Sequence, residues 1–168
     1  MLARRRRAEA TMQAIQDAIP PNHCWGCGTL NPQGLQIKSY LEGDETVCRF
    51  EPPPRFMAGP TSVLYGGTIA SLIDCHSICT AIADAYRAGG RPIGSEPHLW
   101  AVTASLKVDY LAPTPLGQPV ELRARVVEAK GRKRLVACTL RSGGRDRARA
   151  EVVAVEVPAG WDDPAAAG

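Results

Sequence analysis

The sequence is poor in aromatic residues and has no strong excess of either charge. Its 168 residues include two Phe and three Trp, so we expect no stacking platform for single-stranded nucleic acid, which needs exposed aromatic rings. Twenty Lys and Arg stand against seventeen Asp and Glu, a formal net charge of +3. Part of the basic excess is one block, Arg4–Arg7. The rest of the chain is close to charge balance, so a general nucleic-acid surface is not indicated.

Long apolar runs and export signals are also missing. No uninterrupted stretch approaches the ~20 apolar residues that span a bilayer. The basic N-terminus is followed by polar residues, not by the apolar core of a secretory signal. We therefore expect no membrane partner and a cytoplasmic location. The six cysteines are then expected to be free thiols, since a reducing compartment disfavours disulfides.

The length and composition predict one globular domain with short tails. Hydrophobic residues make up 45% and charged residues 22%, which is typical of folded domains. We predict a basic helical extension over residues 1–21, stopped by Pro20 and Pro21 because proline cannot continue a helix. The domain is expected at residues 22–157, and a flexible tail at residues 158–168.

Hydrophobic periodicity predicts two strands, a long helix and then four more strands. The helix is expected over residues 68–87, where apolar side chains recur at spacings of three and four. The strands are expected at residues 35–41, 46–50, 102–110, 120–128, 135–141 and 148–157. Consecutive strands with short turns favour an antiparallel sheet, and one helix is enough to cover one face of it. The predicted fold class is therefore α+β.

Two glycines, Gly66 and Gly67, stand directly before the predicted helix. They leave the first backbone N–H groups accessible at the positive end of the helix dipole, which suits a phosphate, a carboxylate or a developing oxyanion. A glycine pair also serves simply as a tight turn. Asp74 lies inside the helix, where a carboxylate is costly to bury unless it is paired or used. Alone it would be a solvated or hydrogen-bonded helix residue; beside the accessible turn it is a candidate general base or nucleophile.

The residues that flank Asp74 give weaker signals. Asp74 and His76 are two residues apart and do not face each other on a helix, so His76 is interpreted as a core or interface residue. Cys75 and Cys79 are four apart and share a face, as buried thiols often do.

A C-x-x-C motif, Cys24 and Cys27, stands near the start of the domain. A structural zinc site needs four ligands, and only His23 and the distant Cys48 are available to complete this one. A thioredoxin-type motif would need a helix after it, whereas glycines and a proline follow. We therefore predict no bound metal and no structural disulfide.

Three segments of the sequence carry a family resemblance: CWGCGTLNPQGLQI, YGGTIASLIDCHSICTA and VTASLKVDYLAPTPLGQPVELRARVVEAKGRK. They resemble the hotdog-fold thioesterases of the PaaI type, and the first is similar to a branch that includes the thioesterase-superfamily-member proteins. The resemblance covers residues 22–157. It implies a curved antiparallel sheet wrapped around one long central helix, with two subunits joining their sheets and active sites at the dimer interface.

The resemblance also implies roles for single residues. The amide of Gly66 matches the group that polarises the thioester carbonyl. Asp74, contributed by the opposite subunit, matches the catalytic carboxylate, and Thr103 matches the hydroxyl residue that helps to hold the attacking water.

Further substrate contacts are expected from Tyr65, Gly67 and His76. For His76, the interpretation as a core residue stays open as the alternative. Two positions depart from the family pattern. Tyr65 stands where the family usually has His, and Gly59 stands where an Asn is often found.

The basic hairpin residues Arg132, Lys133 and Arg134 are the predicted contacts for the phosphates of coenzyme A, with a solvated turn as the alternative. No cofactor is expected beyond the CoA of the substrate. The prediction is an acyl-CoA thioesterase that acts as a homodimer or homotetramer. One alternative is a hotdog hydratase or dehydratase, whose pattern would place His five residues after Asp74, where this sequence has Cys79. The other is a non-catalytic or acyl-carrier-binding protein of the same fold.

Overall fold

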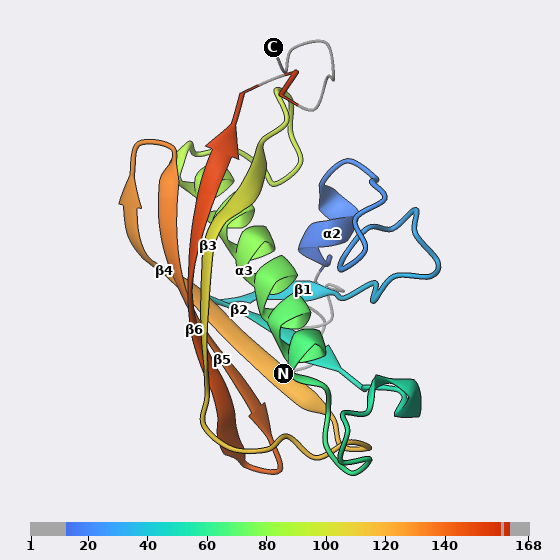
Figure 1. Ribbon diagram of the computed structural model, residues 1–168. Coiled ribbons are helices and arrows are strands. Elements are labelled where there is room, and N and C mark those ends of the chain that lie inside the picture. The colour runs from blue at the N-terminus through green and yellow to red at the C-terminus, as the bar shows by residue number, and fades with distance from the viewer. Residues whose placement is uncertain (1–12, 159, 162–168) are drawn as a thin grey trace, which may run out of the picture.

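The computed structural model describes residues 13–158 and 160–161. Its main features are a long helix and a six-stranded antiparallel sheet on which the helix packs (Figure 1). The elements in chain order are α2 (Ile15–Ala18), β1 (Ser39–Glu42), β2 (Glu45–Phe50), the 3₁₀ turn η1 (Pro54–Phe56), α3 (Gly66–Ala88), β3 (Trp100–Tyr110), β4 (Val120–Lys130), β5 (Lys133–Ser142) and β6 (Arg145–Val157). The α+β prediction is confirmed. Most of the predicted N-terminal extension, including Arg4–Arg7, and most of the predicted tail lie outside the described residues.

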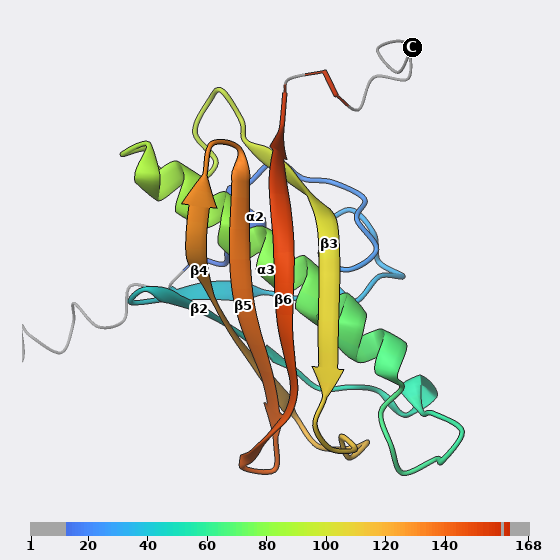
Figure 2. The same ribbon diagram turned by 60° about the vertical axis from the view of Figure 1, so that its left-hand side comes forward.

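The sheet has the strand order β1-β2-β4-β5-β6-β3, and each neighbouring pair is antiparallel. Strand β3 therefore forms one edge, beside β6 (Figure 2). Within the described ranges no strand pairs with the outer side of β3. The backbone groups on that side are available to another strand.

Helix α3 covers one face of the sheet and supplies the centre of the core (Figure 1). The predicted apolar stripe is confirmed, since Ile69, Leu72 and Ile73 are all buried against side chains of the sheet such as Leu122 and Val136. By length and composition α3 could also cross a membrane, but 61% of its most apolar window is buried inside the protein. Its apolar side chains are thus those of the core.

The first predicted strand is the one that differs most from the structure. Extended pairing begins at Ser39 and not at Leu35, because Gln36 has a positive φ of 49° that interrupts the strand. Leu35 and Ile37 are buried, but their N–H groups donate to carbonyls of the C-x-x-C loop instead of to a strand. The long helix and the other predicted strands agree with the structure to within a few residues at each end. Of the described part of the predicted N-terminal helical extension, only Ile15–Ala18 is helical.

Candidate active site

The start of α3 is held in place by its preceding loop. Tyr65 N–H donates to Phe56 O at 2.9 Å, and Thr68 N–H makes the first bond of the helical ladder, to Tyr65 O at 3.0 Å. The N–H groups of Gly66 and Gly67 therefore precede that ladder, as the first amides of a helix do. Both glycines are half-buried. Their amides can donate to an anionic or polarised oxygen at the positive end of the helix dipole.

Two tyrosine rings crowd these glycines. A Cβ added to Gly67 would lie 2.4 Å from the ring of Tyr65, and one added to Gly66 would lie 3.4 Å from the ring of Tyr110. The Tyr110 hydroxyl donates to Gly66 O at 2.7 Å. Burial raises the pKa of Tyr110, and the neighbouring Tyr65 adds to the effect, so this hydroxyl keeps its proton. Tyr110 is the last residue of a strand predicted from the sequence, and no role was predicted for it.

An open groove of about 440 Å³ lies beside Gly66 and Tyr110. Most of its lining is apolar and comes from Ala58, Val63, Leu64, Ile69, Leu111 and Pro113. Such a groove can take an apolar ligand whose polar end meets the start of α3.

Asp74 and Thr103 lie together farther along α3, outside the lining of the groove. The Thr103 hydroxyl of β3 donates to Oδ1 of Asp74. The Asp74 side chain is half-buried, and in the part of the chain that the structure describes no cation pairs with it. The carboxylate is therefore free to accept a proton or to attack a ligand. The structure brings together these two residues, which sequence reasoning had placed in one site.

A β-bulge decides that Thr103 faces the helix. The register of β3 against β6 shifts between Thr103 and Ser105, so the residue between them is an extra one. Side chains alternate along a strand, and residues 103 and 110 would otherwise lie on opposite faces. With the bulge, Thr103 contacts Asp74 and Tyr110 contacts Gly66, both on α3.

Gly66 and Asp74 of one chain are too far apart to act on one carbonyl group. They are separated by eight residues of continuous helix, which corresponds to about 12 Å along the axis. Reacting atoms need to be roughly 3 to 3.5 Å apart before reaction. Within one chain, the amide donors at Gly66 and the carboxylate of Asp74 are thus two separate groups.

His76 lies in the core and not in the groove. It is fully buried; its Nδ1 is 2.8 Å from the Ser39 hydroxyl, and its Nε2 is 3.3 Å from the Thr46 hydroxyl. Burial lowers the pKa of His76 to about 4, so the ring is neutral at physiological pH. Of the two interpretations of this residue, the geometry is that of a core histidine.

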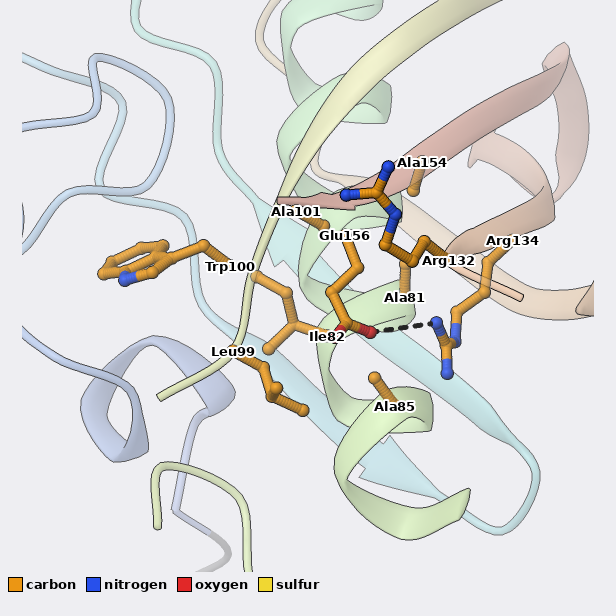
Figure 3. Close-up of a pocket in the computed structure, with 10 residues that line it drawn as sticks. All are labelled: Ala81, Ile82, Ala85, Leu99, Trp100, Ala101, Arg132, Arg134, Ala154 and Glu156. Atoms are coloured by element: carbon orange, nitrogen blue, oxygen red, sulfur yellow. Dashed lines mark ion pairs between the residues drawn. The ribbon is translucent and has the colours of Figure 1, made fainter. Parts of the chain in front are cut away.

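The basic hairpin between β4 and β5 divides into two kinds of residue. Arg134 is buried, and its guanidinium pairs with Asp84 at 2.9 Å. It also pairs with Glu156 at 3.6 Å, as Figure 3 shows. Arg132 and Lys133 are exposed, and among the described residues no carboxylate pairs with either. The structure therefore leaves Arg132 and Lys133 available to a ligand, whereas Arg134 is committed to the protein's own carboxylates.

Three cysteines form a group that sequence reasoning missed. The Sγ atoms of Cys24, Cys27 and Cys75 all lie within 4.8 Å of one another, which makes the group a possible metal site. The two partners weighed for the C-x-x-C motif, His23 and Cys48, are not in it. The neighbouring thiols of Cys24 and Cys75 lower the pKa of Cys27. The argument that the motif lacks partners is wrong, because the helix supplies one.

Comparisons with known proteins agree on one family. A model described as the thioesterase superfamily matches residues 61–149. The acyl-coenzyme A thioesterase THEM4 of Xenopus laevis is 36% identical over 96 residues, which is 57% of this chain and 37% of that protein. THEM4 of Bos taurus is 29% identical over 111 residues, 65% of this chain and 40% of that protein. The chain thus spans less than half the length of these curated relatives.

Solved structures extend the likeness over more of the chain. A thioesterase superfamily protein from Shewanella loihica is 39% identical, with a TM-score of 0.62, and the match covers 82% of this chain and 96% of that one. The PaaI protein of E. coli is 15% identical, with a TM-score of 0.60 and coverage of 74% and 81%. The second match shows the fold alone and confirms the predicted likeness to PaaI.

Proposed function

Because the chain belongs to the thioesterase superfamily, we propose that it hydrolyses an acyl-CoA thioester to a free acid and coenzyme A. One observation carries the proposal. Helix α3 presents amide donors beside an apolar groove at Gly66, and it presents a carboxylate with a hydroxyl partner at Asp74. These are the two halves of a hydrolytic site for an acyl group.

The acyl chain occupies the groove, and its carbonyl oxygen points at the start of α3. There the amides of Gly66 and Gly67 stabilise the negative charge that develops on the oxygen during attack. A single donor of this kind is worth about 10²- to 10³-fold in rate. The Tyr110 hydroxyl supports the arrangement by holding the carbonyl of Gly66 at 2.7 Å.

Asp74 acts on the water, which Thr103 helps to position. The water oxygen bonds to the carbonyl carbon, its proton passes to the Asp74 carboxylate, the carbon–sulfur bond breaks, and the CoA thiolate leaves and is protonated. A positioned base of this kind contributes typically 10²- to 10⁴-fold. Direct attack by the carboxylate would give an acyl-aspartyl anhydride that water then hydrolyses. Both routes need the same free carboxylate.

A second copy of the chain completes the site. Asp74 contacts Thr103 near the beginning of β3, and Gly66 contacts Tyr110 at its end. Two β3 edges paired antiparallel across a twofold axis set the beginning of one strand beside the end of the other. Asp74 of one copy then faces Gly66 of the other. The open edge of β3 and the 12 Å gap within one chain both support this homodimer.

The hairpin residues Arg132 and Lys133 fit the coenzyme end of the substrate. Arg132 O accepts from Glu156 N–H at 2.8 Å, and Glu156 pairs with Ala101 of β3. The hairpin therefore lies at the end of β3 that carries Thr103, next to the Asp74 half-site. Its two exposed cations are suited to the phosphates of coenzyme A.

A panel of acyl-CoA thioesters of different chain lengths tests the activity. Release of free CoA should be measured by chromatography, because the six cysteines of the chain would themselves react with a thiol reagent. We expect turnover with at least one member of the panel. The preferred acyl chain should be the one whose length fits the apolar groove. Absence of free CoA with every acyl-CoA, together with absence of free fatty acid from acyl-carrier-protein thioesters, would favour the non-catalytic alternative.

Mixed dimers test whether the site is shared between chains. Gly66→Pro removes one amide donor at the first helical position, where proline is well tolerated, and Tyr65 before it already has the extended ψ of 129° that proline requires. Gly66→Ala is the matched control, since it adds a Cβ but keeps the N–H.

Homodimers of Gly66→Pro and of Asp74→Asn should both be nearly inactive. Their co-expressed mixture should regain about a quarter of the wild-type rate, since half of the dimers are mixed and each of these has one intact site. No recovery in dimers shown to be mixed would place Gly66 and Asp74 in the same site of one chain.

A further inference from the structure

The cysteines Cys24, Cys27 and Cys75, here called the thiol cluster, have no part in the hydrolysis proposed above. Cys24 and Cys27 come from the loop before β1, and Cys75 comes from the middle of α3. The Cys24 and Cys75 sulfurs are 3.6 Å apart, and all three sulfurs lie within 4.8 Å of one another. Two segments about fifty residues apart in sequence therefore converge on one point through their thiols.

The loop is shaped to deliver its two cysteines to the helix. Gly28 N–H donates to Cys24 O at 2.8 Å, and Cys24 N–H donates to Asn22 Oδ1 at 2.9 Å, which closes the chain into a tight turn. Gly26, between the cysteines, packs directly on Cys75. A Cβ at this position would lie 2.1 Å from the Cys75 sulfur, so only glycine lets the loop approach so closely.

The spacing of the sulfurs matches a metal centre. Zinc binds thiolates at about 2.3 Å in a tetrahedron, which sets neighbouring sulfurs about 3.8 Å apart. The Cys24–Cys75 distance of 3.6 Å agrees with that value. A C-x-x-C pair from a turn plus a cysteine from another element supplies three of the four ligands that zinc takes in a tetrahedral site. Sulfur ligands in this geometry select zinc over the harder divalent ions.

We propose that Cys24, Cys27 and Cys75 bind one Zn²⁺ ion as thiolates and so fasten the loop before β1 to helix α3. Cys79, one helical turn after Cys75, is buried and lies outside this group, and its sulfur accepts from Gln16 Nε2 at 3.3 Å. The three thiolates are therefore the protein ligands, and water takes the fourth position. Because Cys75 directly follows Asp74, the ion anchors the turn of helix that carries the proposed catalytic carboxylate. The site itself is independent of whether the protein hydrolyses thioesters.

Metal content of the full chain, purified under reducing conditions without chelators, is the first test. Elemental analysis should give about one zinc per chain for the wild type. Cys24→Ser and Cys75→Ser should each lose the metal. Cys24 is exposed, so its variant is expected to fold even where the Cys75 variant does not. Cys138→Ser is the matched control, because Cys138 is a buried thiol of β5 outside the thiol cluster, and it should keep the zinc.

Cobalt substitution is the second test. Protein freed of zinc and titrated with Co²⁺ should develop the near-ultraviolet band of thiolate-to-cobalt charge transfer, and Cys24→Ser should weaken it strongly. The proposal is overturned if reduced wild-type protein neither carries zinc nor binds Co²⁺, or if Cys24→Ser and Cys75→Ser both retain zinc at the wild-type level. It is also overturned if mass spectrometry finds a Cys24–Cys75 disulfide, with two hydrogens lost and no metal, in protein kept under reducing conditions.

Discussion

Replacement of Asp74 by Asn separates the chemistry of this residue from its structural role. The amide has nearly the volume of the carboxylate, and its oxygen can still accept the hydrogen bond from the Thr103 hydroxyl. The amide cannot take a proton from water at neutral pH, and it is not a useful nucleophile. We therefore expect the variant to fold and to assemble as the wild type does, but not to hydrolyse thioesters.

The expected magnitudes differ enough to decide between the two roles. Loss of a positioned base costs about 10²- to 10⁴-fold in kcat, which corresponds to roughly 3 to 5 kcal/mol of activation free energy. The change in stability is smaller. It replaces a charge-assisted hydrogen bond by a neutral one at a half-buried site, which is worth about 1 kcal/mol. For a chain of this size that shifts the Tm by about 2 to 4 °C.

The assay compares kcat per folded protein with the Tm of the same preparation, on the best acyl-CoA of the panel. Asp44→Asn is the matched control, because Asp44 is exposed in the turn between β1 and β2 and should keep both values. Thr103→Ala should lose less activity than Asp74→Asn, and Thr103→Ser, which keeps the hydroxyl, less still. Wild-type turnover in folded Asp74→Asn would refute the mechanism, and a large fall in Tm with activity retained would assign Asp74 a structural role.

Replacing Arg132 and Lys133 together by Gln should raise the KM for acyl-CoA several-fold with little change in kcat, because phosphates are bound equally in the ground and transition states. Arg145→Gln, at the exposed first residue of β6, is the control, and a loss confined to kcat would remove the hairpin from the coenzyme site. His76 has its pKa lowered from 6.5 to about 4 by burial, so the unfolded chain takes up its proton first as the pH falls. The free energy of unfolding should therefore decrease by up to about 3 kcal/mol between pH 7 and pH 4, and an equal decrease in His76→Gln would contradict the assignment.

Local sequence patterns were enough to predict the elements that carry the candidate site. The stripe of Ile69, Leu72 and Ile73 follows the helical repeat, and burial of that stripe is a property of the segment itself. The glycine pair marks the start of the helix and forms its first two residues. Their amides could be predicted to be free because any helix leaves its first N–H groups unpaired. Asp74 could be singled out for the same reason, as a carboxylate inside an apolar helix is unusual in any fold.

Contacts between segments could not be predicted, because each depends on how two distant parts of the chain are placed. The bulge that turns Thr103 toward Asp74 is an irregularity of pairing between β3 and β6, and no residue type signals it. Arg134 has the same charge as Arg132 in the sequence. Only the tertiary structure brings Asp84 and Glu156 next to Arg134, and these ion pairs make Arg134 unavailable to a ligand.

The C-x-x-C motif shows both what the local sequence determines and what only the tertiary structure determines. The sequence by itself determined that Cys24 and Cys27 share a turn, because a turn is set by neighbouring residues and by Gly26 and Gly28. Only the tertiary structure decided that Cys75 stands opposite them, since the loop reaches α3 by packing across about fifty residues of intervening chain. Periodicity and turn chemistry act over a few residues and can be read from the order of side chains. A ligand set or a shared active site needs the whole fold, because the distances that create it exist only after the core has formed.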